Sequence, residues 1–405
     1  MIPLHRPPFG LAPVLAAAIS SAARNQLARV EAAYAEFAGL HAIWLPSARA
    51  GIDWSLRAAT TAETQVLAPA FTCSVVHELL IAAGHRVRWF EPDSDELLVS
   101  TATLAPQQTS PQALILCELY GHTYDLAQLT RQSVAPPVIR VVDMAMAVPH
   151  ASLFARLEER DFAVISFGTG KNMYAGWGAM GFARNAALAA EVRKIRDASL
   201  VPQAGKLAVR RALDAAARVV GNKPLIHAVA RKFRDHLPRP RRPSNQAPAE
   251  GAANVGRPDL ARTPEWKQPS TKVDRALALW NLRHAAEARA ARVNLAARYQ
   301  QRLVNASGIR CPRATGDALS HFTVRIGAGI RNRVKERLYA KGINTVTLWA
   351  FSARLNAVDF PHTSRTCDEV LNLPLAPWMT TNQVDFVCES LMRCVAEAGQ
   401  DSPSA

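Results

Sequence analysis

The first half of the chain alternates short apolar runs with stretches long enough for a helix. The runs contain β-branched residues and are Val66–Ala68, Val87–Phe90, Ala113–Cys117, Val138–Val142, Val164–Phe167 and Met180–Ala183. Strands of this kind, separated by helices, form a largely parallel sheet that is covered on both faces. Ligands gather at the carboxyl ends of the strands in such sheets. The pattern therefore predicts an α/β fold whose site lies near Asp143 and the turn after Phe167.

A lysine and an aspartate follow two of these runs. Lys171 lies in the segment SFGTGKN, which begins within the run Val164–Phe167. Asp143 directly follows the run Val138–Val142. An enzyme that uses pyridoxal phosphate needs an amine that forms a Schiff base with the cofactor's aldehyde, and a carboxylate that keeps the ring nitrogen protonated. The two residues together favour such a site. The alternatives are a solvated lysine after a strand and a helix-capping aspartate.

Several segments, in chain order, carry a resemblance to one family. The central one, DFAVISFGTGKNMYAGWGAMGFAR, begins at Asp161 and reads D-x4-S-F-x3-K-N, followed by a glycine-rich turn and an apolar run. The others are MIPLHRPPFG, VLAPAFTCSVVHELLIAAGHRVRWFEPDSD, ELYGHTYDL, VIRVVDMAMA, LYAKGINT and VLNLPLAPWMTTNQVDFV. Over most of its length the chain resembles the DegT/DnrJ/EryC1/StrS family, the sugar aminotransferases of pyridoxal enzyme fold type I.

This resemblance implies pyridoxal 5'-phosphate as the cofactor and assigns roles to particular residues. Lys171 matches the Schiff-base lysine, which also moves a proton during transamination. Asp143 matches the carboxylate that pairs with the pyridinium nitrogen, and Ser166 matches a serine that hydrogen-bonds the phosphate. The family's second phosphate element, a Gly-Thr pair before a helix, is replaced by Ala48 and Arg49. Backbone amides at that helix start can still hold a phosphate, although Arg49 facing solvent is the alternative.

Several positions depart from the family pattern. Cys73 replaces an aromatic ring that stacks on the cofactor, and Met146 replaces a glutamine that contacts it; both remain candidate cofactor-binding residues. Trp177 replaces a glutamate, and Leu348 and Trp349 stand where histidine and tyrosine are common. These changes favour either an unusual acceptor substrate or a non-catalytic, cofactor-free relative that acts as a binding or regulatory protein.

The length and composition allow two domains. A chain of 405 residues with 49% hydrophobic content can bury a large core. We expect a large cofactor-binding domain over 1–273, a connecting helix over 274–303 and a smaller C-terminal α/β domain over 304–405. The small domain is expected to contain a strand and two helices, the second capped by Thr380 and Gln383: His321–Ile326, Arg331–Lys341 and Asn382–Ala398.

Positive charge is concentrated in one segment. Residues 200–272 hold 15 Lys or Arg against 5 Asp or Glu, so ten units of the formal net charge of +15 lie there. Three interpretations stand: a solvated surface insertion, a basic rim that attracts a diphosphate-bearing substrate, and a reversible contact of residues 200–242 with anionic membrane lipid. No recognised nucleic-acid-binding module accompanies the charge, so no nucleic acid partner is expected.

The remaining sequence features indicate the cellular compartment of the protein. No stretch reaches the roughly 18 apolar residues that span a bilayer, and Leu11–Ile19 lacks the length and the cleavage site of a secretion signal. The six cysteines show no spacing typical of a metal site or a disulfide framework. We therefore expect a cytoplasmic protein without a metal.

The resemblance also implies the reaction. It predicts an aminotransferase that moves an amino group from glutamate to a nucleotide-linked keto sugar, in the synthesis of surface polysaccharides or secondary metabolites. Relatives that dehydrate their substrate replace the lysine by histidine, so Lys171 disfavours that reaction. A homodimer is expected, because both subunits line the pocket in fold type I enzymes.

Overall fold

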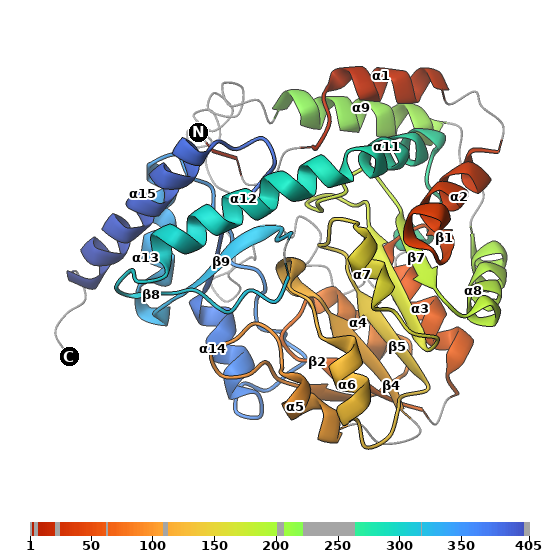
Figure 1. The fold of residues 1–405 in the computed structure, drawn as a ribbon, viewed down its shortest axis with the longest axis horizontal. Helices are drawn as coiled ribbons and strands as arrows, with labels where there is room; N and C mark the ends of the chain where they lie inside the picture. The colour runs from red at the N-terminus through yellow and green to blue at the C-terminus, as the bar shows by residue number, and fades with distance from the viewer. Residues whose placement is uncertain are drawn as a thin grey trace.

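A computed structural model describes residues 2–3, 7–20, 25–61, 64–107, 112–200, 206–221, 264–316 and 318–400. Its larger part is a seven-stranded sheet in the order β1-β7-β6-β5-β4-β2-β3 (Figure 1). The strands are β1 (His41–Leu45), β2 (Gln65–Pro69), β3 (Arg86–Phe90), β4 (Gln112–Cys117), β5 (Ile139–Asp143), β6 (Asp161–Ser166) and β7 (Ala179–Ala183). Neighbours from β3 to β6 pair in parallel, whereas β7 pairs antiparallel with both β6 and β1.

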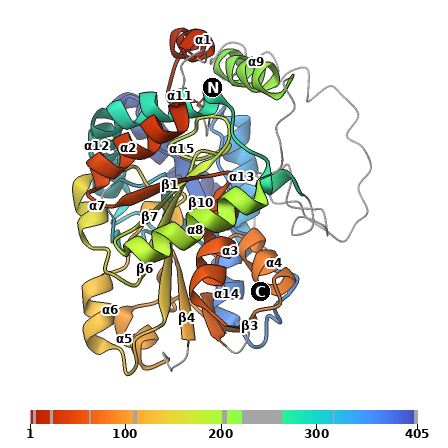
Figure 2. The same cartoon turned by 90° about the vertical axis from the view of Figure 1, so that its right-hand side faces the viewer.

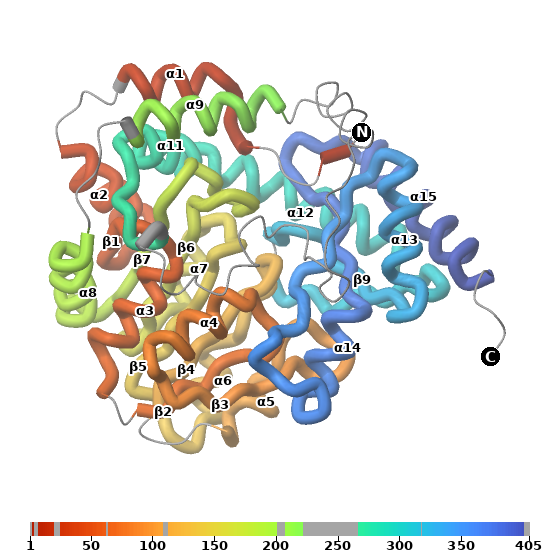
Figure 3. Tube along the Cα trace, turned by 180° about the vertical axis from the view of Figure 1, so that it is seen from behind, coloured from red at the N-terminus to blue at the C-terminus, as the bar shows by residue number. Residues whose placement is uncertain are grey.

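Helices cover both faces of this sheet, and each layer encloses its own apolar core. One face packs against α2 (Gln26–Ala38), α6 (Leu126–Gln132), α7 (Ala151–Ala155) and α11 (Lys272–Arg283). The other face packs against α3 (Ala48–Ala59), α4 (Ser74–Ala82) and α8 (Ala186–Ser199), which are in view in Figure 3. The short helix α5 (Thr101–Leu104) closes the end near β3. Because both faces are covered, most strands are largely apolar and buried, as in buried parallel sheets generally, whereas the edge strand β3 exposes Arg86 and Arg88.

Local sequence signals set where several helices begin. Ser47, Asp125 and Asn185 each accept a hydrogen bond from a backbone N–H in the first turn of the helix that follows. Thr271 and Asp274 form a capping box at the start of α11. These caps fix the starts of α3, α6, α8 and α11.

The smaller part is a three-stranded antiparallel sheet in the order β10-β9-β8. Its strands are β8 (Ile309–Arg310), β9 (His321–Ile326) and β10 (Val370–Pro374), and its helices are α12 (Ala285–Leu303), α13 (Ala328–Ala340), α14 (Pro361–Glu369) and α15 (Thr381–Gln400). A third apolar core joins β9 and β10 to α12, α13 and α15. This core also contains Ile2, so the start of the chain packs with the small sheet, and the division into domains over 1–273 and 304–405 stays a prediction.

Two further helices lie outside the layers. α1 (Leu11–Ser20) and α9 (Lys206–Gly221) pack against each other and against α11 (Figures 1 and 2). Within the part of the chain that the structure describes, no helix has both the length and the apolar character needed to cross a membrane.

The predicted α/β architecture is confirmed, with differences in detail. Each of the six predicted strands is present with a boundary shift of no more than a few residues, and Thr380 and Gln383 form the predicted cap. The helix expected over 274–303 is divided into α11 and α12, because His284 departs from helical geometry with φ of −104° and ψ of 8°. Most of the basic segment 200–272 lies outside the described residues, and α9 is its main described part.

Candidate active site

The site is built on the carboxyl ends of β5 and β6, where Asp143 and Ser166 are the last residues of their strands. A buried ion pair aligns these strands. Arg140 and Asp161 face each other in register, with Nε to Oδ1 and Nη2 to Oδ2 both at 2.7 Å. Arg140 lies three residues before Asp143, and Asp161 is the first residue of β6. The ion pair therefore fixes the relative positions of Asp143 and Ser166 at the ends of the two strands.

Asp143 is a partly buried carboxyl group with a cation nearby. Its Oδ1 accepts a hydrogen bond of 2.9 Å from the backbone N–H of Ala145. Burial raises the pKa of Asp143 above its ordinary value, while the positive charge of Lys171 and this hydrogen bond oppose the shift. The positive charge of Lys171 thus offsets part of the cost of burying this carboxylate, and a protonated ring nitrogen beside it would offset more.

Lys171 lies on a tight loop that follows β6. Gly170 adopts a positive φ of 78°, and the backbone of Lys171 bonds to Gly168 and Tyr174. The Lys171 Nζ lies 3.3 Å from the Met146 sulfur and 5.9 Å from the centre of the Trp349 ring. The side chain thus turns inward over the segment that follows Asp143.

Cys73 and Arg49 belong to the same charged neighbourhood. Burial raises the pKa of the Cys73 thiol, and the positive charges of Lys171 and Arg49 oppose this shift. The thiol is therefore neutral at physiological pH, and it serves as an apolar wall rather than as a nucleophile.

The helix α3 offers an N-terminus beside this neighbourhood. Ser47 accepts from the Ala50 N–H at 3.2 Å and donates to the Trp266 carbonyl oxygen at 2.9 Å, which secures the first turn that contains Ala48 and Arg49. Amide groups at a helix start bind anions, and the phosphate of a cofactor is such an anion. The structure thus places the predicted site residues on adjacent elements.

Three observations test whether pyridoxal phosphate fits. Asp143 and Lys171 are near enough to interact electrostatically, so a single ring could reach both of them. The hydroxyl of Ser166 lies at a strand end, where it accepts from the Gly168 N–H at 3.3 Å. The indole N–H of Trp349, whose ring faces Lys171, is buried without a hydrogen-bond partner among the described residues. An unsatisfied buried donor at this position is expected where a ligand supplies the acceptor.

Lys171 also lines a cavity of about 340 Å³. Its walls include Phe9, Tyr174, Arg218 of α9 and Arg292 of α12. Arg292 donates through Nη1 to the carbonyl oxygens of residues 319, 320 and 375, and burial lowers its pKa to about 9. Two arginines and a lysine make the cavity electropositive.

Tyr174 adds a polar group to this cavity. Its hydroxyl is buried without a hydrogen-bond partner among the described residues, and burial raises the pKa of Tyr174 to about 12. The ring stacks on Phe9 with centroids 5.9 Å apart. Sequence reasoning missed Phe9, Tyr174 and Arg292 as individual site residues. It did single out the basic segment that supplies Arg218.

Trp177 has a structural role in the described part of the chain. Its indole N–H donates to the Gln268 carbonyl oxygen at 3.1 Å, and the guanidinium of Arg211 lies 4.5 Å from the centre of its ring. The tryptophan that replaces the family's glutamate therefore ties the loop after Lys171 to α9.

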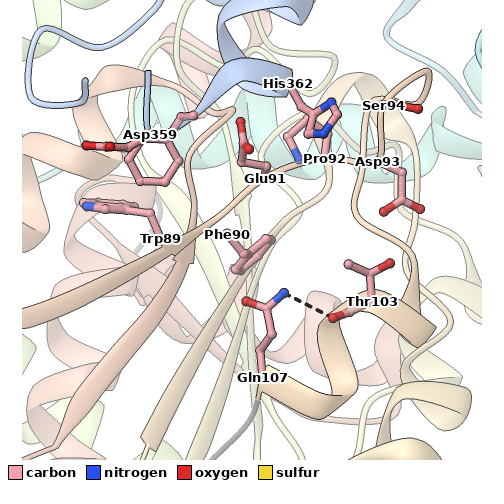
Figure 4. Close-up of a pocket in the computed structure, with 11 residues that line it drawn as sticks. Trp89, Phe90, Glu91, Pro92, Asp93, Ser94, Thr103, Gln107, Asp359 and His362 are labelled. Atoms are coloured by element: carbon pink, nitrogen blue, oxygen red, sulfur yellow. Dashed lines mark hydrogen bonds between the residues drawn. The ribbon is translucent and has the colours of Figure 1, made fainter. Parts of the chain in front are cut away.

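A second cavity, of about 590 Å³, lies between the end of β3 and the start of α14 (Figure 4). Glu91, Asp93, Asp359 and His362 line it, and it shares no lining residue with the Lys171 cavity. Glu91 accepts a hydrogen bond from the N–H of Thr363 and so joins the two parts of the molecule. Among the described residues, no cluster of His, Cys, Asp or Glu could hold a metal ion.

A mostly parallel sheet with a lysine loop and a carboxylate at its strand ends is the arrangement expected of an α/β enzyme that depends on pyridoxal phosphate. The family model of the DegT/DnrJ/EryC1/StrS aminotransferase family matches residues 15–223 and 271–392. The chain belongs to this family, and this membership identifies it as an aminotransferase. The family implies pyridoxal phosphate as the cofactor.

Solved structures share the fold. The sugar aminotransferase CalS13 from Micromonospora echinospora is 20% identical, with a TM-score of 0.70, over 97% of this chain and 100% of that one. The PLP-form of the putative sugar aminotransferase Spr1654 from Streptococcus pneumoniae is 16% identical, with a TM-score of 0.71, over 98% and 99%. DesV from S. venezuelae, in complex with a ketimine intermediate, is 19% identical, with a TM-score of 0.66, over 94% of each chain.

Proposed function

We propose that this protein transfers an amino group from glutamate to a keto sugar that is linked to a nucleotide, with Lys171 and Asp143 as its catalytic residues. The observation that carries the proposal is the convergence of the Lys171 amine and the partly buried Asp143 carboxyl at the end of β5. When bound, pyridoxal phosphate supplies an aldehyde and an electron-withdrawing ring.

Each candidate site residue then has a defined task. Asp143 holds the proton on the ring nitrogen, which strengthens electron withdrawal. The Lys171 Nζ would hold the cofactor through its aldehyde and would move a proton to and from the reacting carbon. Ser166 and the first turn of α3, at Ala48 and Arg49, hold the phosphate, while Cys73 and Met146 contact the ring. The walls of the site keep bulk water from these proton transfers.

The cavity beside Lys171 supports an anionic acceptor. Arg218 and Arg292 line it together with Lys171, and guanidinium groups bind phosphate through paired hydrogen bonds. A nucleotide-linked sugar carries a diphosphate, so its charge complements this lining. The Tyr174 hydroxyl provides a further donor for the substrate.

We extend the family expectations to the assembly and setting of the protein. We expect a homodimer, a cytoplasmic location and a place in the synthesis of surface polysaccharides or secondary metabolites. Light scattering of the purified chain at micromolar concentration measures the oligomeric state, and a monomer would contradict the first expectation.

Cofactor attachment provides the direct test. The purified protein should turn yellow with pyridoxal phosphate, and borohydride should bleach the colour and fix the cofactor to the peptide that contains Lys171. The variant Lys171→Ala should take up no borohydride-stable label, whereas Lys194→Ala, which removes an exposed lysine on α8, should label like the wild type. Label on another lysine, or no colour at all, would refute the proposed role of Lys171.

The acceptor can be tested separately. Mass spectrometry after incubation with glutamate and a panel of nucleotide-linked keto sugars should detect an aminated sugar. Other amino donors in the same panel would show whether glutamate is the preferred one.

A second candidate function is a binding or regulatory protein without transaminase activity. It is favoured by the Met146 sulfur, which contacts the Lys171 amine, and by the neutral Cys73 thiol where the family has an aromatic ring. In that case the protein would bind a nucleotide-linked sugar, as measured by calorimetry, yet develop no colour with pyridoxal phosphate.

A further inference from the structure

Arg292 of α12 is a buried cation that the described chain does not neutralise. It is 7% exposed and lines the Lys171 cavity. Burial lowers its pKa to about 9, and no carboxylate of the described residues opposes that shift. Buried charges in folded proteins are normally paired, because an unpaired one is costly to the folded state. A negative charge delivered by a ligand would supply the missing partner.

The other buried arginines of the described chain each have a carboxylate nearby. Three of them form ion pairs shorter than 3 Å, and the fourth interacts electrostatically with an aspartate. These pairs are Arg140 with Asp161, Arg196 with Glu31, Arg325 with Glu369, and Arg331 with Asp368. None of these four arginines lines the Lys171 cavity. The buried arginine without a carboxylate is therefore the one that faces a space for a ligand.

The cavity offers hydrogen-bond donors and no carboxylate. None of the described residues that line it is Asp or Glu. The Tyr174 hydroxyl and the indole N–H of Trp378, both from lining residues, are buried without a hydrogen-bond partner in the described chain. Since burial raises the pKa of Tyr174 to about 12, its hydroxyl keeps its proton and can donate. A ligand that brings negative charge and accepting oxygens matches these groups.

The setting of Arg292 indicates a small anion with a single charge. Its Nη1 donates to the carbonyl oxygens of residues 319, 320 and 375, which hold the guanidinium in place, and Nη2 takes part in none of these bonds. Arg218, by contrast, has a side chain that is 39% exposed and pairs with Asp214 at 3.1 Å. A diphosphate carries more than one charge and suits the more exposed Arg218. One fixed, buried guanidinium is balanced by one carboxylate, whose planar oxygens match its donors.

We propose that Arg292 binds a carboxylate group of a substrate, with the Tyr174 hydroxyl as a second donor. This inference rests on the proposed function and refines it, because it leaves Arg218 to contact the diphosphate of the acceptor. Two substrates of that reaction could bring the carboxylate. One is the amino donor, whose α-carboxylate is attached to the carbon that carries the amino group. The other is an acceptor whose sugar ring carries a carboxylate.

Calorimetry with two matched pairs of probes tests the proposal and separates the two sources. Glutarate and pentanoate have the same carbon chain and differ by one carboxylate. Glucuronic acid 1-phosphate and glucose 1-phosphate differ by the carboxylate on the sugar. None of the four contains an amine or a ketone, so none is expected to react with Lys171 or the cofactor. The wild type should bind the carboxylate-bearing member of at least one pair about tenfold or more tightly than its counterpart. A preference within the first pair assigns the carboxylate to the donor, and one within the second assigns it to the sugar.

Three variants connect this preference to the proposed residues. Arg292→Gln should reduce it to within about twofold. Tyr174→Phe should lower it about threefold or more, yet leave the Tm of the ligand-free protein unchanged, because the hydroxyl makes no hydrogen bond there. Arg331→Gln is the matched control. Arg331 also donates to backbone carbonyl oxygens but does not line the cavity, so its replacement should leave the preference within about twofold of the wild type.

Several results would overturn the proposal. One is a wild-type protein without a preference in either pair. Another is an Arg292→Gln variant that keeps the preference, or that weakens glucose 1-phosphate as much as glucuronic acid 1-phosphate, which would assign Arg292 to the phosphate. If Arg292→Gln does not fold, an unchanged preference in Tyr174→Phe refutes the site. A protein that labels at Lys171 without any preference would refute the carboxylate site alone, whereas a preference without colour would refute only the role of Lys171.

Discussion

Removing Arg140 should destabilise the protein strongly, and in a pH-dependent way. Arg140 and Asp161 are both almost wholly buried, and their two contacts of 2.7 Å connect β5 to β6. The variant Arg140→Met leaves the Asp161 carboxylate buried without its cation. Breaking a buried pair from one side costs about 3–5 kcal/mol of the free energy of unfolding. The double variant Arg140→Met, Asp161→Leu should lose less, because no unpaired charge remains.

The pH dependence follows from Asp161. Burial already raises its pKa above the ordinary value in the wild type, with Arg140 opposing that shift. Without Arg140 the pKa rises further. A carboxyl group whose folded pKa is raised contributes stability at low pH and loses it as pH rises through that pKa. The deficit of Arg140→Met relative to the wild type should therefore be larger at pH 8 than at pH 5.

Urea unfolding, followed by tryptophan fluorescence at both pH values, measures these differences. The slope should approach about 1.4 kcal/mol per pH unit where the single proton is taken up. A loss below about 1 kcal/mol for Arg140→Met would refute the argument that the pair is buried and tightly coupled. So would a deficit that does not change between pH 5 and pH 8.

Three other substitutions have defined outcomes. Asp143→Asn removes a charge that, at about 4 Å and an effective dielectric constant near 20, contributes about 4 kcal/mol, so kcat should fall about 10³-fold in a coupled transaminase assay. In the wild type, burial raises the pKa of Asp274 to about 6, so stability is lost as pH rises through 6. Asp274→Asn should lack that decline in urea unfolding at pH 5 and pH 8. Gly178→Ala should lower Tm in calorimetry, since Gly178 has φ of 115° and a Cβ there would lie 2.5 Å from the Trp44 ring.

The sheet could be predicted largely from local sequence patterns. Buried strands are short apolar runs, and β2 and β4 to β7 largely show such runs, whereas the edge strand β3 alternates exposed arginines with apolar residues. β1 was not predicted, although HAIWL is apolar. Its place at the edge depends on antiparallel pairing with β7, more than 130 residues away, and local periodicity carries no information about such a contact. The break at His284 was also missed, because the apolar spacing continues on both sides of it.

The candidate site shows the same limit. Lys171, Asp143 and Ser166 follow apolar runs, so their positions could be inferred from strand ends. Arg292 could not, since it is one of many arginines in an amphipathic helix and its sequence neighbours resemble those of exposed ones. It is directed into the cavity by three carbonyl oxygens from the small domain, which only the folded chain brings together.

The departures from the family pattern leave uncharged groups next to the Lys171 amine. The Lys171 amine faces a thioether at Met146 and an indole ring at Trp349, and burial keeps the nearby Cys73 thiol neutral. None of these three side chains carries a charge. The Asp143 carboxyl interacts electrostatically with Lys171, and it is the group that we propose pairs with the ring nitrogen of the cofactor. Because Met146 stands where the family has a polar glutamine, we expect the orientation of the cofactor ring to depend chiefly on this carboxylate.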